Sequence, residues 1–185
     1  MLPGMRWTMA ERPPERVDEQ APQIADAHAF LARHHCLSLA TNGPDGLWAS
    51  TVFYVNAGFD LYFLSLAGTR HVRNLEVDPR VAGTVNDDVA DWVSIRGIQL
   101  EGRAELVGEG RRREVLEMFS LHYAFPDVIW WDADQTAPRA AQRIYRIRPS
   151  RLLFIDHGIG SGRLDVPLES LEARGASQDG CSPRT

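Results

Sequence analysis

The chain has 185 residues, of which 44% are hydrophobic, and this length fits one domain with a single core. Its formal net charge of −5 disfavours nucleic acid as a partner, because binding to phosphates requires a basic surface. All 20 basic residues are arginines. An anion site must therefore be built from guanidinium groups, histidines, hydroxyls and backbone N–H groups.

The two ends of the chain differ in composition from its middle. Residues 1–20 are polar and proline-punctuated, without the apolar stretch of an export signal, and predict a disordered lead-in. Residues 158–185 are rich in Gly, Ser and Pro and predict a flexible tail. We therefore expect one folded domain at residues 21–157, located in the cytoplasm, since no segment reaches the length of a membrane span. Cys36 and Cys181 are too few for a disulfide framework or a zinc cluster.

Helices are predicted where apolar residues recur at intervals of three and four. The segments with this spacing are residues 24–35, 70–78 and 109–123. Pro79 ends the second of them, because proline cannot continue a helix. Thr69 suits the N-cap of the same helix, since its hydroxyl can accept a hydrogen bond from a first-turn N–H.

Strands are predicted where β-branched and aromatic residues lie between turn formers. These segments are residues 36–41, 47–56, 61–65, 80–85, 91–107, 143–148 and 152–156, of which 91–107 is a long or bent strand pair. Gly97 and Gly102 mark bulges or close approaches within that pair. About seven strands in meander order, with helices between them, predict a mainly β (α+β) fold, a closed antiparallel barrel with peripheral helices.

The most informative stretch is residues 64–75, where a strand passes through a glycine turn into a helix. Ser65 ends the strand, and Thr69, Arg70 and His71 open the helix. Their hydroxyls, guanidinium and imidazole converge with the first-turn N–H groups, which carry partial positive charge. This pattern predicts an anion site, and the alternative is an ordinary solvated helix start with a threonine cap.

The run from Thr69 to Leu75 and the Asp-Pro-Arg-Val sequence at 78–81 resemble the pyridoxamine 5′-phosphate oxidase-like, FMN-binding split-barrel superfamily. The chain looks most similar to a small bacterial branch related to that oxidase, and the likeness covers residues 30–156. The resemblance implies a split β-barrel homodimer that holds FMN at the subunit interface. It also implies an oxidoreductase that acts on a small organic substrate.

The resemblance places the FMN phosphate at the turn and the isoalloxazine along the preceding strand. The cofactor-binding residues that it implies are Ser50, Thr51, Val52, Phe53, Leu64, Ser65, Thr69, Arg70, His71, Gly97 and Gln99. Because the cofactor itself carries out hydride transfer, no catalytic side chain and no metal ligand are expected.

Two positions depart from the family pattern. The family often has lysine where His71 stands, so the phosphate site lacks a permanent charge there. The glutamine that often touches the ring aligns with Gly97, and Gln99 lies two residues further along the same strand face. For Gln99 the alternative is an ordinary barrel glutamine bonded to a nearby loop. Arg96 points to the opposite face and is expected to be structural or at the dimer interface.

Three functions from different classes remain open at this point. The first is an FMN-dependent oxidoreductase, with a deazaflavin as a less favoured cofactor. The second is a flavin- or haem-binding protein without turnover, although the histidines are dispersed without ligand spacing. The third is a cofactor-free dimer that keeps the barrel, for which His71 and the displaced glutamine are the argument.

Overall fold

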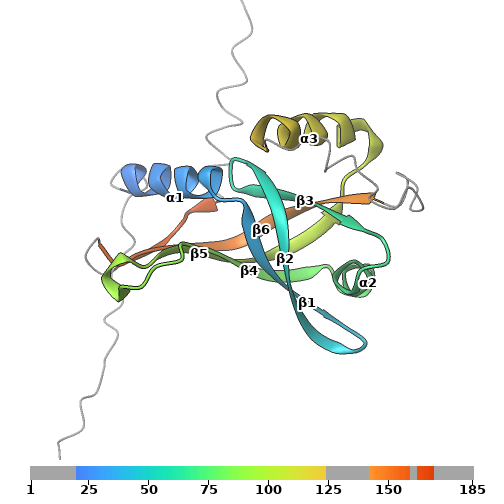
Figure 1. Cartoon of the computed structure of the whole chain (residues 1–185), viewed down its shortest axis with the longest axis horizontal. Coiled ribbons are helices and arrows are strands. Elements are labelled where there is room, and N and C mark those ends of the chain that lie inside the picture. Colours follow the sequence, from blue (N-terminus) through green and yellow to red (C-terminus); the bar gives the residue numbers. More distant parts are fainter. Residues whose placement is uncertain (1–19, 124–141, 159–161, 169–185) are drawn as a thin grey trace, which may run out of the picture.

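The computed structural model describes residues 20–123, 142–158 and 162–168 (Figure 1). The lead-in predicted for residues 1–19, the part of the predicted tail after residue 168, and Cys181 lie outside them. The helices in these ranges are α1 (Ala21–Arg33), α2 (Arg70–Val77) and α3 (Glu109–His122), with a 3-10 turn, η1 (Trp92–Ser94). The strands are β1 (Cys36–Gly43), β2 (Gly46–Ala57), β3 (Asp60–Leu66), β4 (Arg80–Asn86), β5 (Arg96–Leu106), β6 (Gln142–Asp156) and β7 (Arg163–Asp165).

Six strands close into an antiparallel barrel in the order β3-β2-β1-β4-β5-β6, with β3 paired to β6. This confirms the predicted fold class. The first three strands form a meander, and the last three form another. The prediction of one continuous meander was wrong, because α2 carries the chain across the barrel and β4 pairs with β1 rather than with β3.

The strands predicted at residues 143–148 and 152–156 are one strand, β6, which continues through Pro149. Its pairing with β5 shifts register between Glu101 and Gly102, opposite this proline. Proline has no N–H to offer the ladder, so it is tolerated where a bulge interrupts the pairing. The proline therefore marks a bulge in a continuous strand and not the break that was predicted.

The strand pair predicted for residues 91–107 is instead the turn η1 followed by the single strand β5. The Asp91 carboxylate accepts a hydrogen bond from the backbone N–H of Val93 at 3.3 Å. This cap stabilises the turn. The strand consequently begins only at Arg96.

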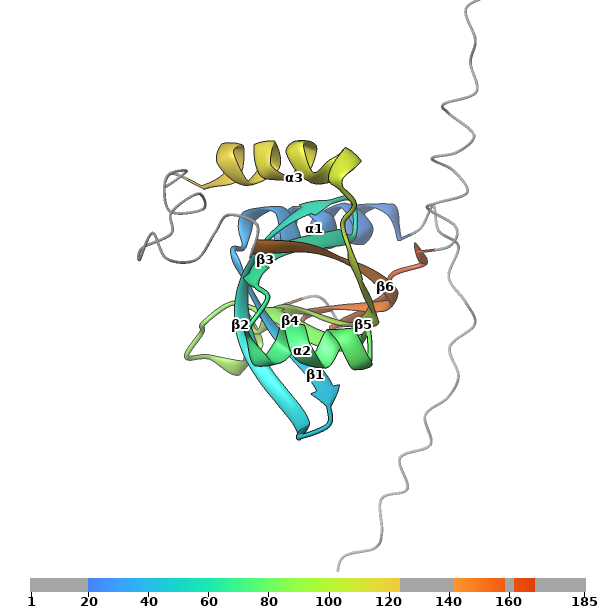
Figure 2. The same cartoon turned by 90° about the vertical axis from the view of Figure 1, so that its right-hand side faces the viewer.

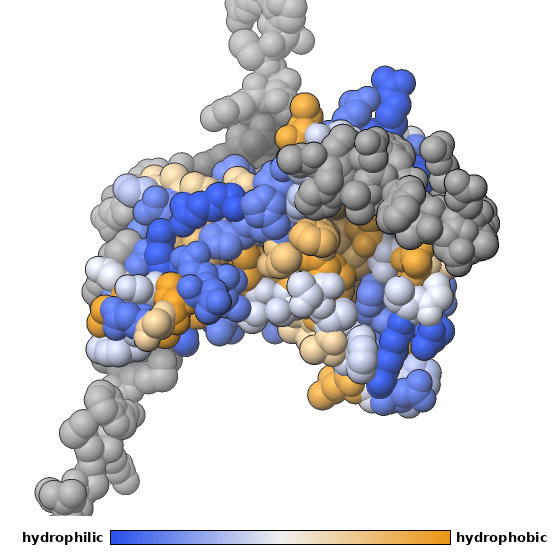
Figure 3. All heavy atoms as spheres, in the orientation of Figure 1, coloured by the Kyte–Doolittle hydropathy of each residue, from blue (hydrophilic) through white to orange (hydrophobic). Residues whose placement is uncertain are grey.

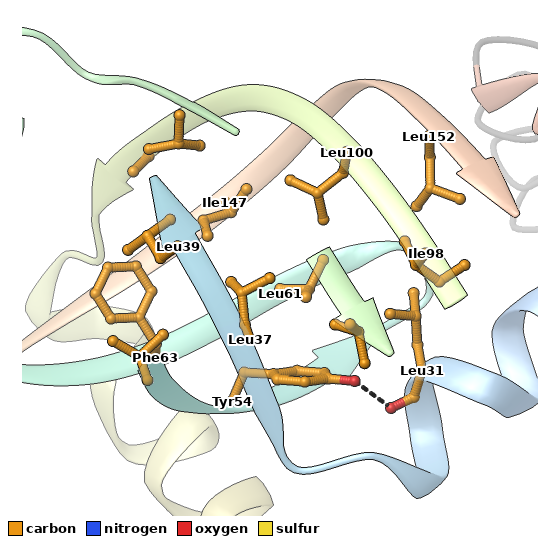
Figure 4. Close-up of a cluster of buried hydrophobic side chains, with 14 of the residues drawn as sticks. Leu31, Leu37, Leu39, Tyr54, Leu61, Phe63, Ile98, Leu100, Ile147 and Leu152 are labelled. Carbon is orange, nitrogen blue, oxygen red and sulfur yellow. Dashed lines mark hydrogen bonds between the residues drawn. The ribbon is translucent and has the colours of Figure 1, made fainter. Parts of the chain in front are cut away.

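One large hydrophobic cluster fills the barrel (Figure 4). On β1, Leu37 and Leu39 are fully buried while Ser38 between them is exposed, as the two-residue period of a strand requires. The buried Tyr54 of β2 donates its hydroxyl hydrogen to the Leu31 carbonyl at 2.8 Å, which ties α1 to the barrel. Burial raises the pKa of Tyr54, so this phenol stays a donor.

The other two helices lie on opposite sides of the barrel (Figure 2). Under α3 lies a second buried cluster, made of Val55, Tyr62, Val115, Leu116, Phe119, Tyr123 and Ile144. On α2, Val72 and Leu75 join the main core. None of the helices within the described ranges is long and apolar enough to cross a membrane.

The short strand β7 lies in the segment that composition assigned to the tail. Leu164 is buried against the core at 8% exposure and Val166 at 3%. The backbone N–H of Val166 bonds to the Leu152 carbonyl at 2.9 Å. Two buried apolar side chains thus hold a segment whose glycine and serine content gave no such indication.

Candidate functional site

Three polar side chains meet where β3 passes into α2, and we call Ser65, Thr69 and His71 the polar triangle. Ser65 Oγ lies 2.6 Å from His71 Nε2 and 3.1 Å from Thr69 Oγ1. Thr69 Oγ1 lies 3.1 Å from His71 Nε2. A backbone bond from Thr69 N to the Leu66 carbonyl, 3.1 Å long, closes the turn that brings them together.

The Thr69 hydroxyl does not cap α2, which corrects the predicted N-cap bond. It donates to the Leu66 carbonyl instead, at 2.9 Å. The first N–H groups of an α-helix have no partner within the helix. Those of α2 are not capped by this side chain and can donate to an anion, which the helix dipole also favours.

His71 is buried at 9% exposure. Burial penalises the imidazolium and lowers the pKa of His71 below its ordinary value, so the ring is neutral near pH 7. A neutral ring has one donor and one acceptor nitrogen. At Nε2, either Ser65 donates to the ring or the ring donates to the hydroxyl oxygens.

We expect the free energy of unfolding to decrease between about pH 7 and pH 5, partly through His71. The pKa of His71 is lowered in the folded protein, so the unfolded chain takes up the proton first as the pH falls below about 6.5. Stability is therefore present above that pH and is lost below it. Urea unfolding at several pH values measures the slope, which should be smaller in His71→Gln. An unchanged slope would contradict the burial penalty.

His122 provides the matched comparison for this titration. Its pKa is also lowered, by burial and by the nearby charge of His35. His122→Gln should reduce the same slope without touching the polar triangle. The contributions of His71 and His122 to the pH dependence of stability can thus be measured separately.

Arg70, the fourth residue predicted to bind phosphate, is directed to the turn between β1 and β2. Its guanidinium carbon lies 4.6 Å from the centre of the Trp48 ring. Its Nη2 donates to the Asp45 carbonyl at 2.7 Å. Its Nε is shielded from solvent and has no hydrogen-bond partner among the described residues.

The β1–β2 hairpin is fixed to α2 by a buried polar contact. Asn74 of α2 is 2% exposed and donates its Nδ2 hydrogen to Thr41 Oγ1 at 3.1 Å. A Cβ on Gly43 would lie 2.2 Å from Asn74 Oδ1, so a larger residue at this position would require the Asn74 side chain to move. The hairpin therefore stands in a defined position beside the start of α2.

The predicted ring-binding strand presents its residues on two faces, as expected from alternation. Val52 is buried, while Phe53 is 53% exposed and Thr51 is exposed on the other face. Ser50 shares the inner face with Val52 and also with Trp48. Ser50 Oγ is shielded and has no hydrogen-bond partner among the described residues.

Gln99 lies on the outer face of the barrel, in one cross-strand row with Thr51, Ser38 and Thr84. Three strand spacings, about 14 Å, separate it from Thr51. The structure therefore does not bring Gln99 to the polar triangle, whose His71 packs toward the interior beside Phe63.

The row that contains Gln99 borders a hollow of ≈ 350 Å³ on the outer face. Its lining residues are Ser38, Leu39, Ala40, Ala49, Ala82, Gly83, Thr84, Gln99 and Leu100. In the view where β1 and β2 lie in front, the centre of the surface is weakly polar to apolar between more hydrophilic margins (Figure 3). The hollow is therefore lined entirely by uncharged side chains.

The remaining predicted residues have structural neighbours. A Cβ on Gly97 would lie 2.6 Å from Asn86 Oδ1, so Asn86 occupies the space that a side chain would need. Leu64 packs against the cluster under α3. Arg96 pairs with Asp156 at 2.7 Å and lies over the ring of Phe30, which agrees with the first of its two predicted roles, the structural one.

Among the described residues, no group of three or more His, Cys, Asp or Glu side chains could hold a metal ion. His34 and His157 are both bonded to backbone carbonyls, at 2.7 Å to Phe30 and 2.9 Å to Trp92. His122 Nε2 is shielded and has no partner within the described ranges, and its ring centre lies 4.9 Å from that of His35.

The sequence model of the family described as pyridoxamine 5′-phosphate oxidase matches residues 24–156, which include the whole barrel up to the end of β6. The chain belongs to the pyridoxamine 5′-phosphate oxidase family. A UPF0306 protein of Photorhabdus laumondii is 33% identical over 109 residues, which are 56% of this chain and 76% of that protein.

Solved structures share the barrel of this family. A conserved hypothetical protein from Mycobacterium tuberculosis aligns with a TM-score of 0.61 and 26% identity, over 72% of this chain and 84% of that one. HutZ, the haem storage protein from Vibrio cholerae, aligns with a TM-score of 0.57 and 22% identity, over 71% of this chain and 91% of HutZ. An FAD-binding protein from Mesorhizobium loti aligns with a TM-score of 0.56 and 17% identity, over 69% of this chain and 90% of that protein. The last two comparisons show the fold alone, and that fold holds flavin in one protein and haem in another.

Sequence reasoning missed Trp48, Asp45 and Asn74 as neighbours of the site. Each lies on the hairpin or on the face of α2 that contacts it. The turn formers at residues 42–46 predicted a hairpin but carried no signal of what it packs against. Only the crossing of the chain through α2 brings the hairpin residues Asp45 and Trp48 to Arg70.

Proposed function

We propose that this chain is an FMN-binding homodimer that works as a flavin-dependent oxidoreductase. The observation that carries the proposal is the polar triangle at the start of α2, with Arg70 beside it in the sequence. A phosphate dianion offers only acceptor oxygens. The Ser65 hydroxyl, an imidazole N–H, a guanidinium and helix N–H groups are all donors, while the Thr69 hydroxyl hydrogen is taken by the Leu66 carbonyl. The donor set thus matches a terminal phosphate.

Two shielded polar atoms without partners support a ligand in the same region. Arg70 Nε and Ser50 Oγ have no hydrogen-bond partner among the described residues. Buried polar atoms are nearly always bonded, so such atoms call for an explanation. Ser50 shares its strand face with Trp48, and Trp48 contacts Arg70. A bound phosphate ester can supply acceptors to both.

Bound flavin would supply the electron transfer, and the residues of this chain would bind and orient it. Binding of phosphate selects the state of His71 in which Nε2 carries hydrogen, because phosphate cannot donate to the ring. The backbone of β2 at residues 50–53 is proposed to lie along the ring system. The chemistry then needs no nucleophile from the protein.

A second copy of the chain is proposed to cover the outer face of the sheet. The hollow beside Gln99 is lined mainly by small side chains, and Phe53 on the same side of β2 is 53% exposed. Large apolar side chains at the edge of a flat surface are typical of protein interfaces. Light scattering should give twice the mass of one chain, and a monomer would contradict this part of the proposal.

The absorption spectrum of freshly purified protein tests the cofactor. A flavin spectrum, or its appearance after FMN is added and excess removed, is expected. Bleaching by a nicotinamide donor and recovery in air would then support an oxidoreductase over a storage protein. A protein that stays colourless with added FMN would contradict the proposal.

Haem is the second candidate, because HutZ shares the barrel and is a haem storage protein. The specific observation in its favour is the shielded, unpartnered His122 Nε2 of the described structure, next to His35. Neutral imidazole is a haem ligand, and burial keeps the pKa of His122 low. A haem spectrum that His122→Ala abolishes would favour this candidate over flavin.

His71→Lys is expected to tighten FMN binding by about tenfold near pH 7.5, because a permanent charge replaces a neutral ring beside the phosphate. Equilibrium titration of flavin fluorescence measures the change, with His71→Gln as the uncharged control. The pH profile of the unmodified protein is a poorer measure, since the phosphate itself titrates at about pH 6. An unchanged dissociation constant in the lysine variant would show that position 71 does not face the phosphate.

A further inference from the structure

Trp48 is a large aromatic side chain on the protruding hairpin, 41% exposed and outside both hydrophobic clusters. Core packing does not account for its position. Its ring lies against the Arg70 guanidinium, 4.6 Å from the guanidinium carbon to the ring centre. A cation over an aromatic face is an attractive contact, and it also limits where the cation can move.

The strand that carries Trp48 is itself fixed relative to α2. Trp48 pairs across the hairpin with Thr41, which is buried and accepts the hydrogen bond from Asn74. The tip of the same hairpin supplies the Asp45 carbonyl to Arg70 Nη2 at 2.7 Å. The guanidinium is therefore held on one face by an indole and at one nitrogen by a carbonyl.

The guanidinium nitrogen of Arg70 that has no partner in the described structure is free to donate to an anion. Nη2 is engaged with Asp45, while Nε is without a partner in the described structure. An arginine loses much side-chain freedom when it binds an anion, and this loss weakens binding. A guanidinium already held by its surroundings loses less.

We propose that Trp48 is a positioning residue, which holds Arg70 in place for the phosphate of the flavin. This inference rests on the FMN function proposed above and extends it to the β1–β2 hairpin. Trp48 acts through Arg70 and does not bind the phosphate itself. Its effect should therefore be confined to ligands that carry the phosphate.

The experiment compares the dissociation constants of FMN and riboflavin, which differ by the phosphate. We expect Trp48→Leu to weaken FMN binding by about three- to tenfold, the range of a partly desolvated cation–π contact, and to leave riboflavin binding unchanged. Trp48→Phe, which keeps an aromatic face, should restore most of the FMN affinity. Leu47→Ala is the matched control, because Leu47 is the next residue of the hairpin and is 82% exposed. Circular dichroism establishes that each variant is folded.

Combination with Arg70→Ala separates the possible outcomes. In that background Trp48→Leu should cause no further loss, because the residue it positions is gone. A further loss there, or an equal loss for riboflavin, would overturn the positioning role. If Arg70→Ala weakens FMN binding and Trp48→Leu does not, the inference fails while the FMN function stands. If Arg70→Ala binds FMN unchanged, the phosphate lies elsewhere and the inference fails while FMN binding stands. If the unmodified protein binds no FMN, the proposed function fails and the inference fails with it.

Discussion

Arg70→Ala is expected to weaken FMN binding at least about tenfold, which corresponds to about 1.4 kcal/mol or more. The variant removes a charge-assisted donor to the phosphate, while the polar triangle keeps its own contacts. It also removes a group whose Nε has no partner in the described part of the chain. Fluorescence titration with FMN measures the effect.

Two comparisons make the Arg70 result specific. Arg113→Ala removes an arginine that lies on α3 and pairs with Glu117 at 3.2 Å, so it should leave the affinity unchanged. Riboflavin should bind the Arg70 variant as it binds the unmodified protein. Equal FMN affinity before and after the Arg70 substitution would place the phosphate elsewhere.

Gly102→Ala should lower the free energy of unfolding by about 3 kcal/mol, at the upper end of overpacking effects. A Cβ at this position would lie 2.2 Å from the Arg148 carbonyl oxygen and 2.8 Å from Pro149 Cα. Both are backbone atoms of β6, so relief requires the two strands to move apart at the bulge. Urea denaturation measures the loss.

Gly110→Ala is the control, and it should raise the free energy of unfolding instead of lowering it. Gly110 lies within α3, and no atom lies within 4 Å of the position of its Cβ. Alanine favours a helix over glycine by about 0.5–1 kcal/mol, so this variant should be slightly more stable. A Gly102 variant as stable as the Gly110 variant would contradict the close strand approach.

Most elements were predictable because their signals are local. Alternation in Leu37 to Leu39 and the turn formers after Thr41 required no knowledge of distant residues. The polar triangle was predictable for the same reason, since its members lie within seven residues of one another. Local sequence therefore suffices for the turn and its donors.

The features that were missed depend on contacts between distant segments. Pro149 alone predicts the end of a strand. The strand continues because the pairing with β5 forms a bulge at this position, where no N–H is required. Gln99 was expected at the flavin ring through the resemblance, and in the structure it lies on the outer face of the barrel, opposite Thr84. No local pattern contains this information.

The pairing of β3 with β6 has a consequence for how the protein is made. Ser65 stands opposite Arg143, so the strand that delivers the polar triangle stays an open edge until residues 142–147 have left the ribosome. Pairings between such distant segments form late and slowly. The polar triangle is thus completed among the last parts of the barrel, and nascent chains expose an unpaired strand edge until then.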